Sequence, residues 1–231
     1  EHMAIACLLT SVTTAVGLAR VLASERPAWS IRLVDVDHLD PRLLDAPPGQ
    51  EVALREGRLY RRVLQPAPVE TAPEEKPPFR RQGVYLLLGG AGGIGTELAL
   101  HLARRYEARV ILLGRRPSNP AIESSLQSIR KAGGEGIYLR ADATDAESLR
   151  SAVAEGRRHF GRIHGAIHSA LVLQDRSIDR MDKETFERVC QVKTLGSIHL
   201  AAALEDEDLD WLALFSSAGS FAAPEGQSNY A

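Results

Sequence analysis

The stretch VYLLLGGAGGIGTELALHLARRYEARVILLGRR, residues 84–116, decides the fold of this 231-residue chain. An apolar run, Val84–Leu88, breaks into a glycine-rich segment, and apolar residues at helical spacing follow it. A second apolar run, Val110–Leu113, ends in one glycine and two arginines. The order strand, glycine turn, helix and strand within about 30 residues predicts a βαβ unit of a parallel sheet.

The glycine-rich segment is suited to holding a phosphate. Backbone without Cβ atoms turns sharply and comes close to a pyrophosphate, and N–H groups at the start of the next helix face the anion. We predict a dinucleotide-binding loop made of Gly89, Gly90, Ala91, Gly92, Gly93, Ile94 and Gly95. Its glycine spacing is looser than the six-residue motif and resembles the loop of short-chain dehydrogenases/reductases. The alternative is a glycine turn that only connects strand and helix.

The end of the second strand predicts which cofactor binds. An acidic residue there would bond the ribose 2′-hydroxyl of NAD, whereas an arginine accommodates the 2′-phosphate of NADP. Arg115 and Arg116 occupy this position, and no carboxylate follows before Glu123. We therefore predict NADPH, with a solvated basic turn as the alternative.

Composition excludes several classes of protein. The chain is 44% hydrophobic and 25% charged, and its 28 Lys and Arg do not exceed its 30 Asp and Glu, which predicts no nucleic-acid surface. Cys7 and Cys190 form neither a disulfide framework nor a metal motif, which predicts no metal site and a reducing, cytoplasmic setting. The uncharged segment Ala4–Ala19 is too short for a membrane span and is interpreted as a buried helix.

The chain divides into three predicted parts: residues 1–65, a proline-rich linker at 66–78, and residues 79–231. The first part has no phosphate loop, catalytic cluster or metal set, and is predicted to be the end of a structural unit. Its signals are a helix over Val12–Ala23, a strand over Ile31–Val36, a turn at Pro47–Gly49, and a hairpin of Glu51–Arg55 and Arg58–Leu64 around Glu56–Gly57.

Strand and helix signals alternate through the third part. After residue 116 they are a helix at Ala121–Lys131, a strand at Ile137–Arg140, a helix opened by a Thr144–Glu147 capping box and running to about Phe160, a strand at Ile163–His168, a helix at Asp182–Leu204 and a strand at Trp211–Phe215. This order predicts an α/β fold, a doubly wound, Rossmann-like parallel sheet. Ligands bind such sheets at the strand carboxyl ends, which here carry the glycine loop, Arg115, Asp142, Ser169 and Ser217.

Three residues could support carbonyl chemistry, and a fourth, Asp142, could bind the cofactor. Asp142 could accept from an adenine amino group, or could only cap a helix entry. Ser217 and Tyr230 lie 13 residues apart, and Lys193 precedes Ser217 by 24 residues. Carbonyl reduction needs a proton donor and a second hydrogen bond at the carbonyl oxygen, and an ammonium lowers a tyrosine pKa. Each residue alone also fits a structural role.

The ordered set of motifs resembles the ketoreductase domain of modular polyketide synthases. The motifs are GGAGGIG, LLGRR, ADATD, IHSALVLQD, the Lys193 helix and LFSSAGSFAAPEGQSNYA. The resemblance implies NADPH-dependent reduction of the β-carbonyl of an acyl chain held on an acyl carrier protein. It also implies an N-terminal, cofactor-free Rossmann-like structural subdomain, other synthase domains as partners, no nucleic acid and no membrane. The resemblance further implies that this chain is truncated at both ends.

The resemblance also assigns roles to residues. Tyr230 would be the general acid, Ser217 would orient the carbonyl, and Lys193 would lower the tyrosine pKa and contact the cofactor ribose. Asp175 matches the last aspartate of the LDD motif of B-type reductases, and Ala222 replaces the tryptophan of A-type enzymes, which implies a D-configured 3-hydroxy product. Gly89, Gly93 and Gly95 would hold the pyrophosphate, Arg115 and Arg116 would lie at the 2′-phosphate, Asp142 and Ala143 at the adenine, and Ser169 beside the cofactor.

Two other functions fit the same sequence. A non-catalytic pseudo-ketoreductase domain would only scaffold neighbouring synthase domains, but the catalytic residues that such domains lose are kept here. A free-standing short-chain reductase for small ketones fits less well because of the extra N-terminal part and linker.

Overall fold

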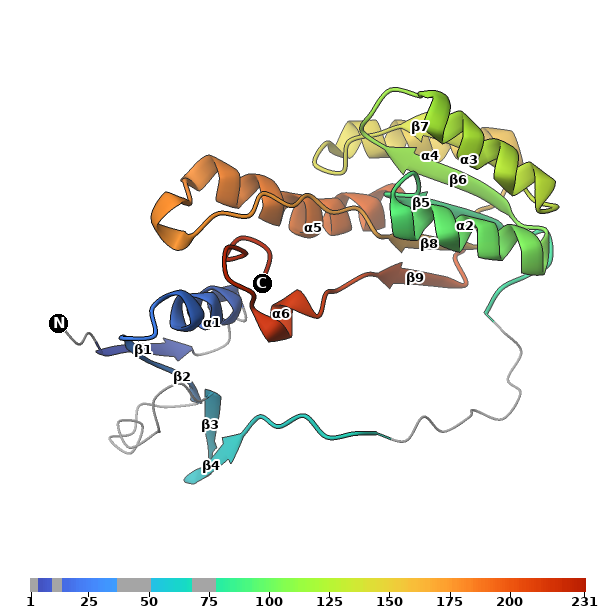
Figure 1. Cartoon of the computed structure of the whole chain (residues 1–231). Helices are drawn as coiled ribbons and strands as arrows, with labels where there is room; N and C mark the ends of the chain where they lie inside the picture. Colours follow the sequence, from blue (N-terminus) through green and yellow to red (C-terminus); the bar gives the residue numbers. More distant parts are fainter. Residues whose placement is uncertain (1–3, 10–13, 37–50, 68–77) are drawn as a thin grey trace. The chain divides into compact units, whose positions relative to one another are not determined.

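The computed structural model describes residues 4–9, 14–36, 51–67 and 78–231 (Figure 1). These belong to two compact units. The first unit draws on residues 1–71, 173–187 and 216–231, and the second on residues 72–172 and 188–215. The turn predicted at Pro47–Gly49 and most of the predicted linker lie outside the described residues. The subdomain boundaries predicted from the sequence stay a prediction.

The first unit is built on a small sheet with the strand order β1-β2-β3-β4. Its elements are β1 (Ala4–Leu9), α1 (Thr14–Glu25), β2 (Ser30–Val36), β3 (Glu51–Arg55) and β4 (Arg58–Arg61). β1, β2 and β3 are parallel, and β3 and β4 form an antiparallel hairpin. Glu56 and Gly57 join them with φ values of 49° and 73°. Two left-handed residues are what a tight hairpin turn requires, so the predicted hairpin is confirmed, although its second strand ends at Arg61 and not at Leu64.

The helix expected over Ala4–Ala19 is wrong in its first part. Ala4–Leu9 is strand β1, and it pairs in parallel with β2 from Ala4 opposite Ser30 to Leu9 opposite Asp35. A short apolar run cannot by itself be distinguished as strand or helix, and here the pairing with β2 decides. The helix begins only at Thr14 and runs to Glu25, two residues before Pro27.

The second unit contains a parallel sheet of five strands in the order β7-β6-β5-β8-β9. Its strands are β5 (Val84–Leu88), β6 (Arg109–Gly114), β7 (Glu135–Arg140), β8 (Gly165–His168) and β9 (Trp211–Leu214). The helices are α2 (Gly93–Tyr106), α3 (Pro120–Lys131), α4 (Ala146–Phe160) and α5 (Lys183–Ala203), and two short helices, η2 (Ile178–Arg180) and α6 (Gly219–Ala222), follow β8 and β9 in the first unit. The doubly wound α/β fold predicted from the sequence is confirmed.

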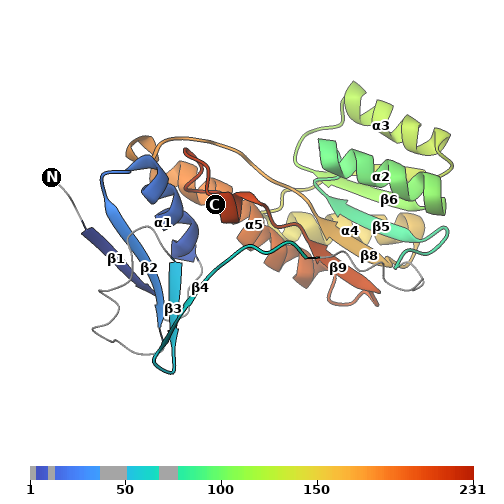
Figure 2. The same cartoon turned by 60° about the horizontal axis from the view of Figure 1, so that its bottom comes forward.

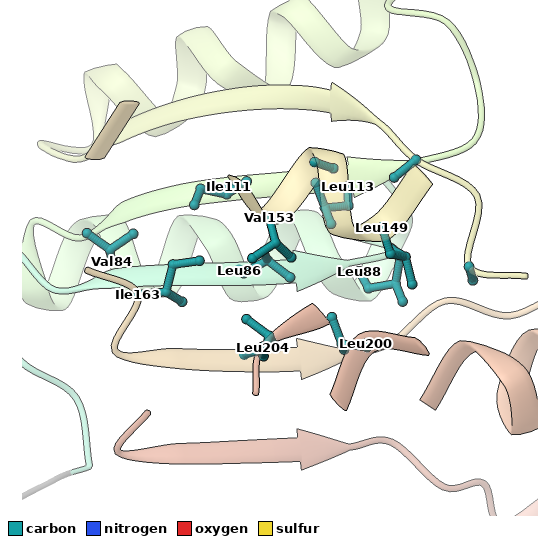
Figure 3. Packing of buried hydrophobic residues seen from close by; sticks show 14 of the residues in the cluster. Val84, Leu86, Leu88, Ile111, Leu113, Leu149, Val153, Ile163, Leu200 and Leu204 are labelled. Atoms are coloured by element: carbon teal, nitrogen blue, oxygen red, sulfur yellow. The ribbon is translucent and has the colours of Figure 1, made fainter. Parts of the chain in front are cut away.

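Alternate side chains of β5 face opposite layers of this unit. Leu86 and Leu88 pack with residues of α4 and α5 (Figure 3), while Tyr85 and Leu87 pack with residues of α2 and α3. Figure 2 shows α2 and α3 on one side of β5 and β6, and α4 on the other. All five β5 side chains are buried. Burying each leucine stabilises the fold by about 1.5–3 kcal/mol, so this strand is the centre of the core.

Chain order reverses at β5. The chain proceeds from β5 to β6 and β7 on one side, and then crosses back so that β8 and β9 lie on the other side. Loops that leave β5 and β8 therefore diverge at the carboxyl ends of these strands, which opens a crevice there. This is the place where the sequence puts the glycine loop and Ser169.

The predicted capping box at the start of α4 is wrong. Asp145, not Thr144, is the N-cap, and its carboxylate accepts hydrogen bonds from the backbone N–H groups of Glu147 at 2.9 Å and Ser148 at 3.0 Å. Thr144 is engaged in the preceding turn, where its N–H and its hydroxyl both donate to the Asp142 carboxylate, at 2.9 and 2.8 Å. An aspartate one residue later is an equally good cap, and the Asp142 turn leaves Thr144 unable to serve.

Candidate active site

A cavity of about 750 Å³ opens at the carboxyl ends of the strands of the second unit. The residues predicted to bind the cofactor gather around it: its lining includes Gly89, Ala91, Gly92, Gly93, Ile94, Gly95, Arg115, Arg116, Asp142, Ala143 and Ser169. Gly90 does not line the cavity. Its N–H donates to the Leu87 carbonyl at 2.9 Å, and it lies against Leu112 beneath the loop. The fold thus brings four separated loops to one crevice.

Two glycines of the loop are required by its shape. Gly89 has a φ of +88°, and a Cβ atom there would lie 2.5 Å from the Ala170 nitrogen. A Cβ atom on Gly95 would lie 2.5 Å from the Gly89 carbonyl oxygen. At Gly93, by contrast, no described atom lies within 4 Å of the added Cβ position. The loop therefore leaves open space beside Gly93, where a bound group would meet bare backbone.

The N-terminus of α2 has the features of an anion-binding site. Gly92 is the N-cap and gives no side-chain hydrogen bond to the first turn, which also contains no acidic residue. The first N–H groups of a helix lack partners within the helix, and its dipole is positive at this end. A pyrophosphate fits these features, so the loop is suited to a dinucleotide.

The arginine pair is held by the neighbouring strand. The Tyr138 hydroxyl lies 2.8 Å from the Gly114 carbonyl oxygen and 2.6 Å from that of Arg116, and the Arg140 guanidinium donates to the Arg115 carbonyl at 3.1 Å. Burial raises the pKa of Tyr138 above its ordinary value, so the phenol stays neutral and donates. β7 thereby fixes the backbone at the end of β6, from which the two arginine side chains extend.

Asp142 serves the local turn. Its carboxylate accepts two hydrogen bonds from Thr144, as described above, whereas the helix cap considered for it is supplied by Asp145. Asp142 is nonetheless exposed and lines the cavity beside Ala143. Ser169 lies at the other wall, where its N–H and its hydroxyl both donate to the Leu88 carbonyl, at 2.8 and 3.1 Å. The adenine role of Asp142 stays a prediction.

Lys193 lies on α5 in the second unit. Its ammonium donates to the Phe215 carbonyl at 3.0 Å, and burial lowers the pKa of the amine. The residue before Lys193 is held by His168, which is 1% exposed and whose Nε2 lies 3.0 Å from the Val192 carbonyl oxygen. Burial lowers the pKa of His168 as well, which favours the neutral ring donating through Nε2. β8 therefore fixes the helical turn that carries the lysine.

Ser217 and Tyr230 both belong to the first unit and converge on Gly219. The Gly219 N–H donates to the Ser217 hydroxyl at 3.0 Å. A Cβ atom added to Gly219 would lie 3.2 Å from Ser217 Oγ and 3.5 Å from Tyr230 Cδ1. The hydroxyl and the phenol ring therefore flank one point of the backbone, although 13 residues separate them in the sequence.

Asp175 is bonded to the segment that precedes Tyr230. The Gln227 amide donates to the Asp175 carboxylate at 2.9 Å, and the Asn229 amide donates to the Gln174 carbonyl at 3.0 Å. Backbone pairing reinforces these contacts, because the Arg176 N–H donates to the Gly226 carbonyl at 2.8 Å. The segment carrying Asp175 and the segment carrying Tyr230 are thus held together.

The sequence analysis missed several residues that line the cavity, among them three with long polar side chains. Arg188 and Gln191 of α5 line it, as does Tyr138 of β7. The spacing of Arg188 and Gln191 was a usable signal, because residues three positions apart lie on the same side of a helix. Tyr138 gave no signal, since a tyrosine in a strand is ordinarily a packing residue.

Within the described part of the chain, no helix is long and apolar enough to cross a membrane. The same residues contain no group of three or more His, Cys, Asp or Glu side chains placed to hold a metal ion.

Known proteins match this sequence and this fold. The model of the KR domain family matches residues 83–231. The chain belongs to the KR domain family. It is 38% identical over 222 residues to polyketide synthase ThaG of Burkholderia thailandensis, covering 93% of this chain and 4% of that protein. It is 35% identical over 221 residues to polyketide synthase PksN of Bacillus subtilis, again covering 93% and 4%. This KR domain chain therefore spans a small part of each curated relative.

Solved structures of ketoreductases resemble this KR domain chain. A ketoreductase domain from the bacillaene assembly line has a TM-score of 0.83 at 25% identity, covering all of this chain and 58% of that one. The first ketoreductase of the tylosin polyketide synthase has a TM-score of 0.80 at 26% identity, covering 99% and 53%. The fold is that of polyketide synthase ketoreductases, which are nicotinamide-dependent oxidoreductases of the short-chain dehydrogenase/reductase superfamily. The resemblance predicted from the sequence is confirmed.

Proposed function

We propose that this KR domain reduces the β-keto group of an acyl chain carried by an acyl carrier protein, with NADPH as the reductant and a D-configured 3-hydroxy group as the product. The observation that carries the proposal is the cavity at the carboxyl ends of β5, β6, β7 and β8, where the glycine loop and the arginine pair meet. The other domains of the same synthase would be its partners.

The choice of NADPH is supported by the end of β6. Arg115 and Arg116 line the cavity, and their backbone is fixed by Tyr138 and Arg140. A guanidinium pairs well with a phosphate because both are charged and their hydrogen bonds are directional. The 2′-phosphate of NADPH would bind there, the pyrophosphate would lie at the glycine loop, and the adenine would contact Asp142 and Ala143.

When bound, the dihydronicotinamide supplies a hydride to the carbonyl carbon. The developing alkoxide then needs a proton, for which we propose Tyr230 as the general acid, and a fixed hydrogen bond, for which we propose Ser217. The hydroxyl and the phenol ring flank Gly219, which supports their joint action on one oxygen. Lys193 would lower the pKa of the tyrosine through its positive charge.

The B-type outcome is supported by Asp175. Its carboxylate accepts a hydrogen bond from Gln227, three residues before Tyr230, so Asp175 lies against the segment that leads to the proposed acid. A residue in this place can restrict the side from which an acyl chain enters, and the side of entry determines which face of the carbonyl receives the hydride. Hydrogen bonding to Gln227 fixes the orientation of Asp175.

The proposal is tested in the domain that carries this sequence, by incubation with NADPH and the β-ketopentanoyl thioester of N-acetylcysteamine. We expect one predominant alcohol enantiomer of D configuration. Tyr230→Phe should lower kcat by at least about a hundredfold, the typical contribution of a general acid, while the Kd for NADPH stays within twofold. Reduction at an equal rate by both proteins would refute the assignment of the acid. Absence of NADPH binding by the unaltered domain would favour a scaffolding pseudo-ketoreductase.

A further inference from the structure

Glu25, the last residue of α1, contacts both segments that carry the proposed substrate-directing residues. One oxygen of its carboxylate, Oε2, accepts a hydrogen bond from the backbone N–H of Ile178 at 2.8 Å. The other, Oε1, accepts from the backbone N–H of Gly226 at 2.9 Å. Ile178 lies three residues after Asp175, and Gly226 lies four residues before Tyr230. One side chain thus joins two loops that are distant in the sequence.

Further contacts surround Glu25 at this junction, the place where the 173–182 and 216–231 segments meet its carboxylate. Gly226 has a φ of +81°, and its carbonyl accepts the Arg176 N–H at 2.8 Å, so both of its backbone polar groups are bonded within the junction. Arg26, beside Glu25, forms an ion pair with Asp179. Glu25 is partly buried. Hydrogen bonds to a charged acceptor are stronger than those between neutral groups, so the carboxylate is well suited to hold two N–H groups at once.

We propose that Glu25 is a positioning residue for the reduction, which fixes the 173–182 segment against the 216–231 segment and thereby fixes Asp175 relative to Tyr230. This inference rests on the proposed function, because it takes Asp175 and Tyr230 in the roles given there. It assigns a task in the chemistry to residues 1–65, the part of the chain whose sequence contains no catalytic motif.

Residue 25 must carry a carboxylate because hydrogen-bond donors have to be paired with acceptors. Two backbone N–H groups face one side chain, so the residue must offer two acceptor oxygens. Glutamine offers one oxygen and places an NH₂ group against the second N–H, which leaves a donor facing a donor. Glu25→Gln should therefore release one of the two segments while changing the volume of the side chain very little. Aspartate keeps both oxygens on a shorter side chain, so Glu25→Asp should have a smaller effect.

The test measures the ratio of alcohol enantiomers, kcat and KM with NADPH and the β-ketopentanoyl thioester of N-acetylcysteamine. We expect Glu25→Gln to lower the enantiomer ratio about tenfold, the size expected for the loss of one hydrogen bond to a charged group. NADPH affinity should stay within twofold, because the cofactor cavity is lined by the second unit. A role in stability alone would lower the folded fraction and leave the enantiomer ratio unchanged, and that result would overturn the proposal.

The matched control is Glu155→Gln on α4, where the exposed carboxylate pairs with Arg158. This control should leave the enantiomer ratio unchanged. If Glu25→Gln does not fold, the same measurements on Glu25→Asp decide, and a ratio equal to that of the unaltered protein contradicts the proposal.

Hydrogen exchange separates this inference from the proposed function. Glu25→Gln should accelerate amide exchange at Ile178, Gly226 or both, by about tenfold or more. If the unaltered domain reduces no β-ketoacyl thioester, the proposed function fails, and the exchange result still tests the junction. If the domain is active and exchange at both amides is unchanged in the variant, the positioning role of Glu25 is refuted while the proposed function stands.

Discussion

At the scale of single residues, the arginine pair shows how the sheet positions charged groups that are visible in the sequence. Arg115 and Arg116 were chosen from the sequence because they follow a strand after a glycine loop. The structure adds that Tyr138 and Arg140 of the next strand hold their backbone from the side. The sequence therefore identified the charged groups, and the sheet supplies their fixed position.

We predict that Arg115→Asp lowers the preference for NADPH over NADH. The carboxylate would repel the 2′-phosphate and could accept from the 2′-hydroxyl of NADH. Loss of a hydrogen bond to a charged group corresponds to roughly a ten- to hundredfold change in the ratio of kcat/KM values. Steady-state kinetics with both cofactors measures this ratio. Arg150→Asp, on the exposed surface of α4, is the control and should leave the ratio unaltered. An unchanged ratio in Arg115→Asp would exclude phosphate recognition at this residue.

At the scale of elements, the structure corrected two sequence expectations for the same reason. The strand Ala4–Leu9 was expected to be helix, and the cap of α4 was assigned to Thr144 in place of Asp145. The apolar run Ala4–Leu9 is compatible with a strand or a helix, and Thr144 and Asp145 are equally suitable as an N-cap. Pairing with β2 makes Ala4–Leu9 a strand. Thr144 donates two hydrogen bonds to the Asp142 carboxylate, which leaves the N-cap position of α4 to Asp145. The strands and helices of the second unit were predicted because short apolar runs alternate regularly with helical segments along the sequence.

The glycine loop gives a prediction at this scale, because replacing two of its glycines by alanine should have different effects on stability and NADPH affinity. Gly95→Ala places a methyl group 2.5 Å from the Gly89 carbonyl oxygen, so the loop must shift and stability should fall by about 1–3 kcal/mol. Gly93→Ala meets no described atom within 4 Å, so stability should hold while NADPH affinity is lost. Urea unfolding without cofactor and a fluorescence titration with NADPH measure the two effects. Equal stability of both variants would contradict the close approach at Gly95.

At the scale of the whole molecule, two histidines at β8 predict how stability depends on pH. His168 is buried against α5, and the Nδ1 atom of His164 accepts the Val84 N–H at 3.0 Å. Burial lowers the pKa of each below the ordinary value of 6.5. The unfolded chain therefore binds protons that the folded chain does not, and stability is lost as the pH falls below about 6.5 towards the lower folded-state pKa values.

Urea unfolding between pH 7.5 and 5.5 measures this dependence, with a limiting slope of about 1.4 kcal/mol per pH unit for each histidine. His168→Asn should make the slope shallower. His159→Gln, at an exposed position on α4, should leave it as it is. A slope that is equally steep in His168→Asn would show that His168 titrates normally in the folded protein.

The parallel sheet, the glycine loop, the arginine pair and the family can all be predicted from the sequence, because each depends on residues that lie close together in the chain or on spacings along it. The folded chain was needed to show that Tyr138, Arg188 and Gln191 line the cavity, that Ser217 and Tyr230 flank Gly219, and that Glu25 bonds two distant loops. A hydrogen bond across 153 or 201 positions leaves no periodicity in a sequence. It exists only once the backbone N–H groups of two loops are brought to one carboxylate.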